Sequence, residues 1–516
     1  MSESLTSNPD PMPSASAYDE LRRELRDIEV LASVNALLAW DQETMMPPGG
    51  TSLRAEQAAA LGQLAHERRT SAKMADLLAG AEGDPALADD PIAVANLREI
   101  RRGFNQAVKV PTSLIRQFAE TTTHAQHAWR DARERSDFEG FAPWLAKIVE
   151  LTKSRAECLS GPDTVDKYDA LLDEYEPGAR TADIVDVFGD LRARLTPLIQ
   201  DIASARSAPE NRLNRIRIPI ERQTAFSSFV AKRVGFDFSA GRLDTSTHPF
   251  CQGVGPGDTR MTTRYTETDF FDALSSTLHE TGHGLYEQGL PKNELLGQPL
   301  SEAISLGIHE SQSRMWENLV GRSKPFWEWA LPEAKKAFGS DLDGVTVDEV
   351  YGAMNIVKPG LIRVDSDEAT YNLHIMIRFD LERGLLSGEL PVRDVPGAWN
   401  ERMKADLGVD VPDDRHGCLQ DVHWSMGAIG YFPTYTLGNL YATQFWAALK
   451  RQLPDLDHSF ARGEFGPLLA WLRREIHSHG RRFTAPDLCQ RVTGESLTAL
   501  PFMAYLESKL KALYTL

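Results

Sequence analysis

Leu278-His279-Glu280-Thr281-Gly282-His283 places two histidines four residues apart, with a glutamate directly after the first. If residues 270–288 are helical, the two histidines lie one turn apart on one face. Two imidazoles placed in this way can bind one metal ion, and Glu280 can reach a water molecule on that ion. The pattern predicts the metal-binding helix of a zinc peptidase, although an ordinary core or surface helix can carry the same residues.

Two glycines in this helix favour the metal-site interpretation. Gly282 and Gly284 lie in the helix interior, where each costs about 1 kcal/mol relative to alanine. Helix stability alone would therefore not select them. The close approach of another backbone, or of the metal site itself, explains them better.

A catalytic zinc site needs a third protein ligand and one open position. A histidine six residues after His283 is absent, because position 289 is glycine. Glu302 and Glu310 remain, and on one helix over 301–318 they would be about 12 Å apart, too far to bind the same ion. Serine, glutamine and arginine follow Glu310 and can orient its carboxylate. We therefore predict Glu310 as the third ligand.

The composition is that of a large soluble protein. The chain has 516 residues, of which 42% are hydrophobic and 25% charged, so we expect a multilayer domain or two fused lobes. The net charge of −18 argues against nucleic acid or an anionic membrane as the main partner. The sequence has no apolar run long enough to predict a membrane span.

The N-terminus and the cysteines indicate a cytoplasmic protein. Residues 1–17 are polar, acidic and rich in proline and serine, without the pattern of a secretion signal. We interpret them as a disordered tail. The widely spaced cysteines fit a reducing compartment and need no disulfide; they are Cys158, Cys251, Cys418 and Cys489.

Helical periodicity dominates the chain on both sides of the metal motif. Residues 215–220 alternate and indicate a short strand or an extended approach to the next helix, and alternation over 260–265 indicates a strand just before the metal helix. At a sheet edge, such a strand could pair with an extended substrate backbone. The predicted fold is therefore mainly α, with a small antiparallel β-sheet beside the metal helix.

Five ordered motifs lie along the second half of the chain. They are Asp258-Thr259-Arg260-Met261-Thr262, His279 to His283, His309-Glu310-Ser311-Gln312, Ile362-Arg363-Val364-Asp365-Ser366-Asp367 and Gly417-Cys418-Leu419-Gln420-Asp421-Val422-His423-Trp424. These motifs resemble those of the carboxypeptidase Taq family of thermostable metallocarboxypeptidases. The likeness covers nearly the whole chain and includes the stretches 40–47 and 168–172. Ser366 departs from the family pattern, which usually has alanine there.

The resemblance implies a mostly helical peptidase with a deep groove and one divalent metal ion, either zinc or cobalt. It also implies a homodimer that releases C-terminal amino acids from peptides with broad specificity. We accordingly treat residues 18–516 as a single helical metallocarboxypeptidase domain. Within it, 18–205 is an N-terminal helical part and 206–516 is the metal-site part.

The residues themselves suggest how such a site would work. His279, His283 and Glu310 leave a coordination position for water, and Glu280 can act as the general base. The tetrahedral oxyanion needs further donors, for which His423, Tyr431 and Tyr435 are candidates. Aromatic residues beside proline and glycine also serve simple packing, and the sequence does not choose between the two tyrosines.

An exopeptidase must also recognise a free carboxylate, and the planar fork of arginine matches its two oxygens. Arg363 is the first candidate, because it precedes a predicted helix start with Asp365 or Ser366 as cap. Arg260 on the predicted strand is the second. Ion pairs with neighbouring acids, such as Asp258 beside Arg260, would explain either arginine without a substrate.

Two other functions use the same residues. A metallo-oligopeptidase would cleave inside a peptide with the same metal chemistry. A non-catalytic binding protein would keep the metal helix as a scaffold, although the position of Glu280 beside both histidines argues against it.

Overall fold

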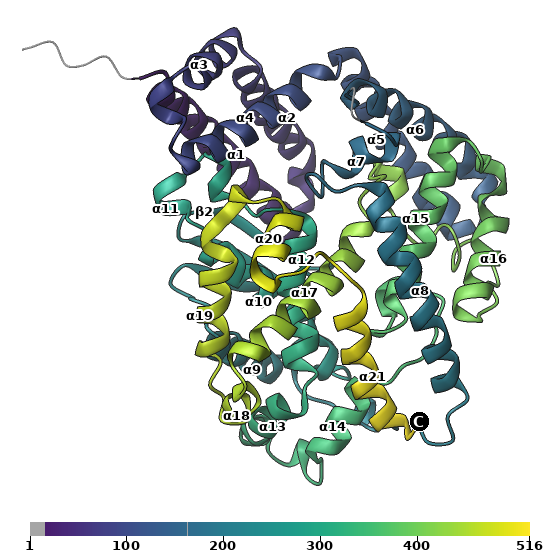
Figure 1. Cartoon of the computed structure of the whole chain (residues 1–516). Coiled ribbons are helices and arrows are strands. Elements are labelled where there is room, and N and C mark those ends of the chain that lie inside the picture. The colour runs from purple at the N-terminus through teal and green to yellow at the C-terminus, as the bar shows by residue number, and fades with distance from the viewer. Residues whose placement is uncertain (1–15, 162–163) are drawn as a thin grey trace, which may run out of the picture.

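The computed structural model describes residues 16–161 and 164–516, and these are mainly helical (Figure 1). Most of the predicted tail, residues 1–15, lies outside the described residues. The helical chain begins slightly earlier than predicted, because the Ser16 hydroxyl accepts a hydrogen bond from the Asp19 backbone and caps a helix that starts at Ala17. Serine in this position is a strong N-terminal helix signal.

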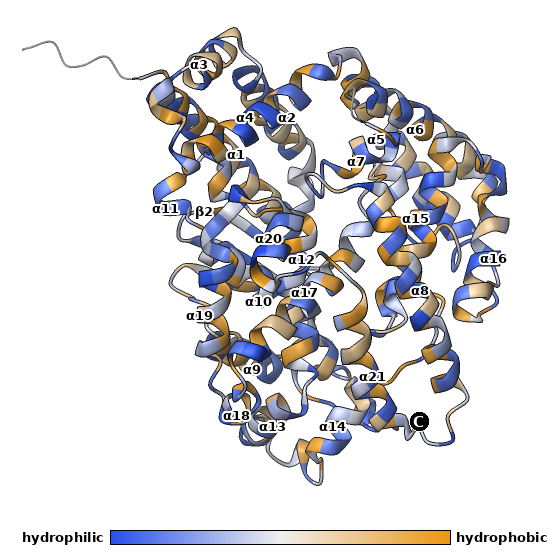
Figure 2. Ribbon diagram, viewed as in Figure 1, coloured by the Kyte–Doolittle hydropathy of each residue, from blue (hydrophilic) through white to orange (hydrophobic). Residues whose placement is uncertain are grey.

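The described part of residues 17–203 forms eight α-helices, of which α1 packs against α2 and α3, and α5 packs against α6. Figure 2 shows hydrophilic and hydrophobic residues side by side along them, as expected for helices with one face in a core. The helices are α1 (Ala17–Thr44), α2 (Thr51–Arg69), α3 (Ala72–Glu82), α4 (Pro91–Lys109), α5 (Thr112–Arg135), α6 (Phe138–Leu159), α7 (Lys167–Leu172) and α8 (Thr181–Ala203).

The second part holds the central helices of the molecule, with α12 and α17 in the middle of the view in Figure 1. Its helices are α9 (Ile220–Val234), α10 (Phe270–Gly289), α11 (Lys292–Leu295), α12 (Leu306–Arg314), α13 (Lys324–Phe338), α14 (Val347–Met354), α15 (Tyr371–Ser387), α16 (Val395–Leu407), α17 (Pro433–Gln452), α18 (Leu456–Ala461), α19 (Gly466–Glu475), α20 (Ala485–Thr493) and α21 (Leu500–Tyr514).

Two hydrophobic cores hold these helices. A small one joins α1, α3 and α4 through residues such as Leu21, Met74 and Ile100. The main core is continuous from α5 to α21 and includes the apolar stripe of α8 with Phe188 and Leu195. Within the described residues, none of the helices combines the length and the apolarity needed to cross a bilayer.

A small sheet packs beside α10, as predicted, but it is mixed rather than antiparallel. It consists of β1 (Gly241–Thr245), β2 (Cys251–Gly255) and β3 (Asp258–Thr263) in the order β1-β3-β2. Strand β3 pairs parallel with β1 and antiparallel with β2. Both sides of β3 are therefore hydrogen-bonded, and the predicted pairing of this strand with a substrate backbone is wrong. The parallel partner was missed because it lies outside the alternating segment.

The alternation over 215–220 proves to be the extended approach to a helix and not a strand. Leu213–Arg215 forms a 3₁₀ turn, and α9 begins directly after Pro219. The Ile218 backbone donates a hydrogen bond to the Glu267 carbonyl. Pro219 cannot donate one, which suits the residue before a helix better than a paired strand.

Helix α12 lies between α10 and α17, and a glycine on each neighbour permits the close approach. A Cβ atom on Gly282 of α10 would lie 2.5 Å from the Gln312 carbonyl oxygen and 2.6 Å from the Ser313 Cα. A Cβ atom on Gly438 of α17 would lie 2.5 Å from the Glu310 Cγ. The close-approach interpretation of Gly282 is confirmed, since backbone meets backbone there.

Gly284 has a related role on the sheet side of α10. A Cβ atom at this position would lie 2.9 Å from the Met261 sulfur of β3 and 2.8 Å from the Phe236 ring. The two glycines thus let α10 approach α12 with one face and the sheet with another.

Candidate metal centre

The structure brings the three predicted metal ligands together from two helices. His279 and His283 lie on α10 and Glu310 on α12, and their ligand atoms are all within 4.8 Å of one another. The Glu310 Oε2 atom is 3.7 Å from His279 Nε2 and 3.5 Å from His283 Nε2. Two imidazole nitrogens and a carboxylate form a donor set that fits a divalent metal ion.

The competing ligand Glu302 lies elsewhere. It follows a 3₁₀ turn and pairs with Arg481 at 2.8 Å. Residues 301–318 are not one continuous helix, because Ser305 caps α12 and a π-helical turn, Met315–Gly321, follows it. Such turns often lie at functional sites.

His279 is held in the tautomer that suits metal binding. Its Nδ1 lies 2.9 Å from Glu317 Oε2, and the Nδ1–H donates to this carboxylate. Nε2, the nitrogen left for the metal, therefore faces Glu310. Burial lowers the pKa of His279, but the carboxylates of Glu310 and Glu317 outweigh it and raise the pKa to about 9.

His283 is oriented through a longer chain of side chains. Its Nδ1 lies 2.5 Å from His309 Nδ1, and His309 Nε2 lies 2.9 Å from Glu287 Oε1. Since Glu287 only accepts, His309 carries its proton on Nε2 and accepts from the His283 Nδ1–H. This leaves His283 Nε2 for the metal. Lys292 pairs with Glu287 at the end of the chain, and burial lowers the pKa of His283 to about 3.

The Glu310 carboxylate is fixed by residues from its own helix. Arg314 Nε donates to Oε1 at 2.7 Å, and the Ser313 hydroxyl donates to Oε2 at 3.1 Å. Burial raises the pKa of Glu310, but Arg314 and His279 more than reverse this and hold it well below its usual value. The orienting role predicted for the neighbouring polar groups is confirmed for these two, whereas Gln312 contacts His477 instead.

Glu317, His309 and Glu287 were missed as supporting residues. Glu317 accepts from Arg314 at 3.2 Å and Arg322 at 3.1 Å in addition to its contact with His279. Glu317 follows Glu310 by seven residues, or two helical turns, and this spacing could have indicated that both lie on the same face. For Glu287 the signal was weaker, because its partner lies on another helix.

Glu280 lies between the two histidines and is 5% exposed. Within the described chain, its Oε2 atom is buried without a hydrogen-bond partner. Burial raises the pKa of Glu280 to about 7, against the opposing effect of His279. A carboxylate oxygen left without a partner beside two directed imidazoles fits a site that a metal ion and a water molecule complete.

The predicted oxyanion donors gather around the start of α17, where His423 and Tyr431 precede the helix and Tyr435 lies in its first turn. The ring of Tyr431 lies 5.4 Å from His423 and 5.3 Å from Tyr435, measured between centroids. Burial lowers the pKa of His423 to about 4. Burial also raises the pKa of Tyr435 well above its usual value, with Tyr431 and Glu310 among the groups that act in the same direction. The two tyrosines therefore experience the field of the metal-binding carboxylate.

Arg363 is 6% exposed and already paired. Its Nε and Nη2 atoms lie 2.9 and 2.8 Å from Asp421 Oδ1, and its Nη1 donates to the Tyr371 hydroxyl at 3.0 Å. The ion-pair partner is thus Asp421 and neither Asp365 nor Asp367, the acids near Arg363 in the sequence. The predicted cap is also wrong, because Asp367 accepts from the backbone before α15.

A chain of contacts connects Arg363 to the metal ligands. The Arg314 guanidinium, which binds Glu310, lies 4.7 Å from the centre of the Tyr371 ring. The hydroxyl of the same ring binds Arg363. The guanidinium of Arg363 also lies 5.2 Å from the Tyr435 ring. Arg363 therefore belongs to the same group of side chains as the metal residues.

Arg260 has a different environment. It forms a two-pronged ion pair with Asp258, at 2.9 and 2.8 Å, and its guanidinium lies 4.4 Å from the Trp40 ring centre of α1. This stacking accounts for the tryptophan of the N-terminal stretch 40–47.

The family assignment follows from comparison with known proteins. A sequence model of the carboxypeptidase Taq (M32) metallopeptidases matches residues 20–510. The chain belongs to this family. It is 46% identical over 513 residues to thermostable carboxypeptidase 1 of Thermus thermophilus, which covers 98% of this chain and 100% of the relative.

Solved structures of relatives agree with this assignment. The M32 carboxypeptidase from Deinococcus radiodurans superposes with a TM-score of 0.94 at 40% identity, over 97% of this chain and 100% of that one. Metallocarboxypeptidase 1 of Trypanosoma cruzi gives 0.92 at 35% identity, over 96% and 99%. The mainly α fold with a small sheet is confirmed.

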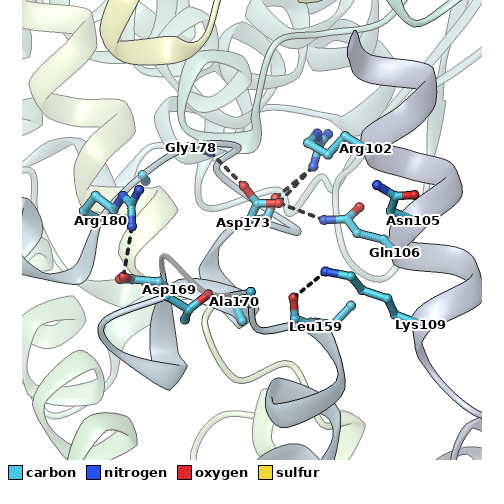
Figure 3. A pocket seen from close by; sticks show the side chains of 13 residues that line it. Arg102, Asn105, Gln106, Lys109, Leu159, Asp169, Ala170, Asp173, Gly178 and Arg180 are labelled. Atoms are coloured by element: carbon cyan, nitrogen blue, oxygen red, sulfur yellow. Dashed lines mark hydrogen bonds and ion pairs between the residues drawn. The ribbon is translucent and has the colours of Figure 1, made fainter. Parts of the chain in front are cut away.

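A pocket of about 300 Å³ lies away from the metal residues, between α4 and the segment that joins α7 to α8 (Figure 3). Asp173 in its wall accepts from Gln106 at 2.8 Å and from the Gly178 backbone at 2.9 Å. The charged groups that line the pocket are largely engaged with one another. The deep groove over the metal residues remains a prediction.

Proposed function

We propose that the protein removes amino acids from the free carboxyl ends of peptides, with a divalent metal ion held by His279, His283 and Glu310. Membership of a metallocarboxypeptidase family supports this function. One observation carries the residue assignment: two imidazole Nε2 atoms face one carboxylate, next to the unpartnered buried oxygen of Glu280.

The chemistry divides between the metal and the protein. A bound divalent ion lowers the pKa of water and polarises the scissile carbonyl. Glu280 takes the proton of the attacking water as general base and passes it to the leaving amine. His423 and one of Tyr431 and Tyr435 donate hydrogen bonds to the oxygen that becomes negative.

Substrate recognition is assigned to Arg363 first and Arg260 second. The contact of Arg363 with Tyr371 places its guanidinium beside the residues that hold Glu310. A substrate carboxylate would share this guanidinium with Asp421, so binding energy comes from the N–H groups not directed at that acid. Arg260 is paired with Asp258 in a similar manner and lies on β3.

The proposal also covers the identity of the metal ion, the oligomeric state and the cellular compartment. Two histidines and a carboxylate are typical zinc ligands, and cobalt is the alternative. The family resemblance suggests a homodimer, which light scattering of the purified protein tests. Composition and cysteine usage suggest a cytoplasmic enzyme that acts on peptides and binds neither nucleic acid nor membrane.

The deciding experiment compares one peptide as its free acid and as its C-terminal amide. Protein loaded with zinc, or with cobalt in parallel, should release amino acids stepwise from the acid and leave the amide intact. Internal cleavage of both would support the oligopeptidase alternative, which the comparisons do not favour. Absence of any release with either metal would support a non-catalytic binding protein.

A further inference from the structure

The segment that carries two of the oxyanion candidates, His423 and Tyr431, has little regular structure of its own. His423 begins a short 3₁₀ turn that ends at Met426, and Tyr431 lies between Gly430 and the start of α17. Gly427 and Gly430 have φ values of 73° and 95°. Side chains on such a segment keep a catalytic geometry only if other parts of the molecule fix the backbone.

A single buried carboxylate fixes this segment at both ends. Glu382 of α15 is 0% exposed. Its Oε1 accepts from the Trp424 indole at 3.0 Å, and its Oε2 accepts from the Gly430 backbone N–H at 3.0 Å. Trp424 follows His423 in sequence, and Gly430 precedes Tyr431. Each donor is therefore one residue away from a proposed catalytic side chain.

The third donor comes from the stretch 168–172, for which the proposed function gives no role in binding the metal or the substrate. The Tyr168 hydroxyl donates to Glu382 Oε2 at 2.7 Å. The same stretch also contacts the segment directly, since a Cβ atom on Gly430 would lie 3.1 Å from the Leu171 carbonyl carbon. Further along, the Tyr175 ring packs edge-on against Tyr431 at 5.2 Å.

Burying the Glu382 carboxylate costs free energy that a purely structural position would not require. A buried carboxylate costs several kcal/mol unless its oxygens are hydrogen-bonded, and an apolar side chain would pack at lower cost. Two of the three donors to Glu382, Trp424 and Gly430, lie in the segment, and the third, Tyr168, lies in the stretch 168–172 that contacts it. Burial raises its pKa to about 7, while these donors and then Arg378 lower it.

We propose that Glu382 is a positioning residue, which sets His423 and Tyr431 for oxyanion stabilisation through Trp424, Gly430 and Tyr168. This inference rests on the proposed function. It predicts that loss of the hydrogen bonds reduces turnover while metal binding is preserved, because the metal ligands lie on α10 and α12 and not on this segment.

The test uses Glu382→Gln and Tyr168→Phe in the full-length metal-loaded protein. Glutamine places an amide N–H against a donor, and a displacement of about 1 Å at a catalytic group can cost about 100-fold in rate. We expect kcat to fall about 100-fold for Glu382→Gln and about 10-fold for Tyr168→Phe. KM and metal content per chain should stay close to those of the wild type.

Tyr514→Phe is the matched control. Tyr514 is also buried, and its hydroxyl accepts from the Val357 backbone at 2.8 Å, outside the hydrogen bonds that hold the segment. This variant should lower the melting temperature and leave kcat unchanged. If Glu382→Gln does not fold, Trp424→Phe removes one of the same hydrogen bonds and should lower kcat about 10-fold.

A mutant cycle separates positioning from general loss of structure. Because Glu382 acts through both His423 and Tyr431, adding Glu382→Gln to a His423→Ala/Tyr431→Phe variant should slow turnover little further. Additive losses, or a Glu382→Gln variant as active as Tyr514→Phe, would overturn the positioning role. An inactive wild-type protein would overturn the proposed function instead, so the two failures are distinguishable.

Discussion

Gly282→Ala is the most direct test of how the fold builds the metal centre. The added Cβ would lie 2.5 Å from the Gln312 carbonyl oxygen and 2.6 Å from the Ser313 Cα. Ordinary contacts begin near 3.4 Å, so the two backbones must separate by about 1 Å. Helix α12 cannot simply retreat, because Gly438 on its other side already lies against Glu310.

The expected effect on stability is modest. Overpacking costs about 1–3 kcal/mol, while alanine in place of glycine returns about 1 kcal/mol of helix propensity. The apo protein should therefore lose no more than about 2 kcal/mol. Metal binding should suffer more, because ligand distances tolerate only about 0.2 Å. We expect the metal affinity to fall about 100-fold, or about 2.8 kcal/mol.

The assay is a titration of metal against a competing chelator, with a thermal melt of the apo protein in parallel. Gly189→Ala is the control, because this exposed glycine of α8 has nothing within 4 Å of an added Cβ. It should leave metal affinity unchanged and stabilise slightly. Wild-type metal affinity in Gly282→Ala would refute the view that the distance between α10 and α12 sets the site.

The remaining predictions concern single side chains. Glu280→Gln should retain the metal but lose about 1,000-fold or more in kcat, measured by amino-acid release, and near-normal turnover would refute its role as base. Arg363→Ala should lower kcat/KM about 100-fold for free-acid peptides and much less for amidated ones; equal losses would remove its role. Glu176 accepts from the Ser305 hydroxyl and the Gly307 N–H, and burial raises its pKa from 4.5 to about 7. Its protonated form is favoured by folding, so this stabilisation is complete below about pH 4.5 and is lost as the pH rises to about 7, a change of roughly 3 kcal/mol. The wild type should therefore lose stability relative to Glu176→Gln between about pH 5 and about pH 8 in thermal melts, and a constant difference would contradict the pKa.

The structural features that the sequence predicts well are those determined by residues close together in the chain. The spacing of His279 and His283 fixes both on one face of α10, and the polar residues after Glu310 lie within one helical turn of it. The strand β3 was visible as an alternating pattern. The assignment of the metal helix therefore needed no tertiary information.

The parts that failed depend on partners that are distant in sequence. Asp421 pairs with Arg363 across 58 residues, and no local pattern marks that choice over the nearer acids. The parallel pairing of β1 with β3 has the same origin. The π-helical turn carries Glu317, which contacts His279. Packing determines this turn, and helix propensity alone does not predict it.

The contacts of residues 168–178 have a consequence for any shortened form of the protein. Although this stretch precedes the metal motif by about a hundred positions, Glu176 caps the helix of Glu310 and Tyr168 holds Glu382. A fragment that starts after α8 would carry every proposed ligand and donor and yet lack two of their supports. Co-expression of the missing fragment should restore what truncation removes, which makes the end of α8 a place to divide the enzyme into two dependent halves.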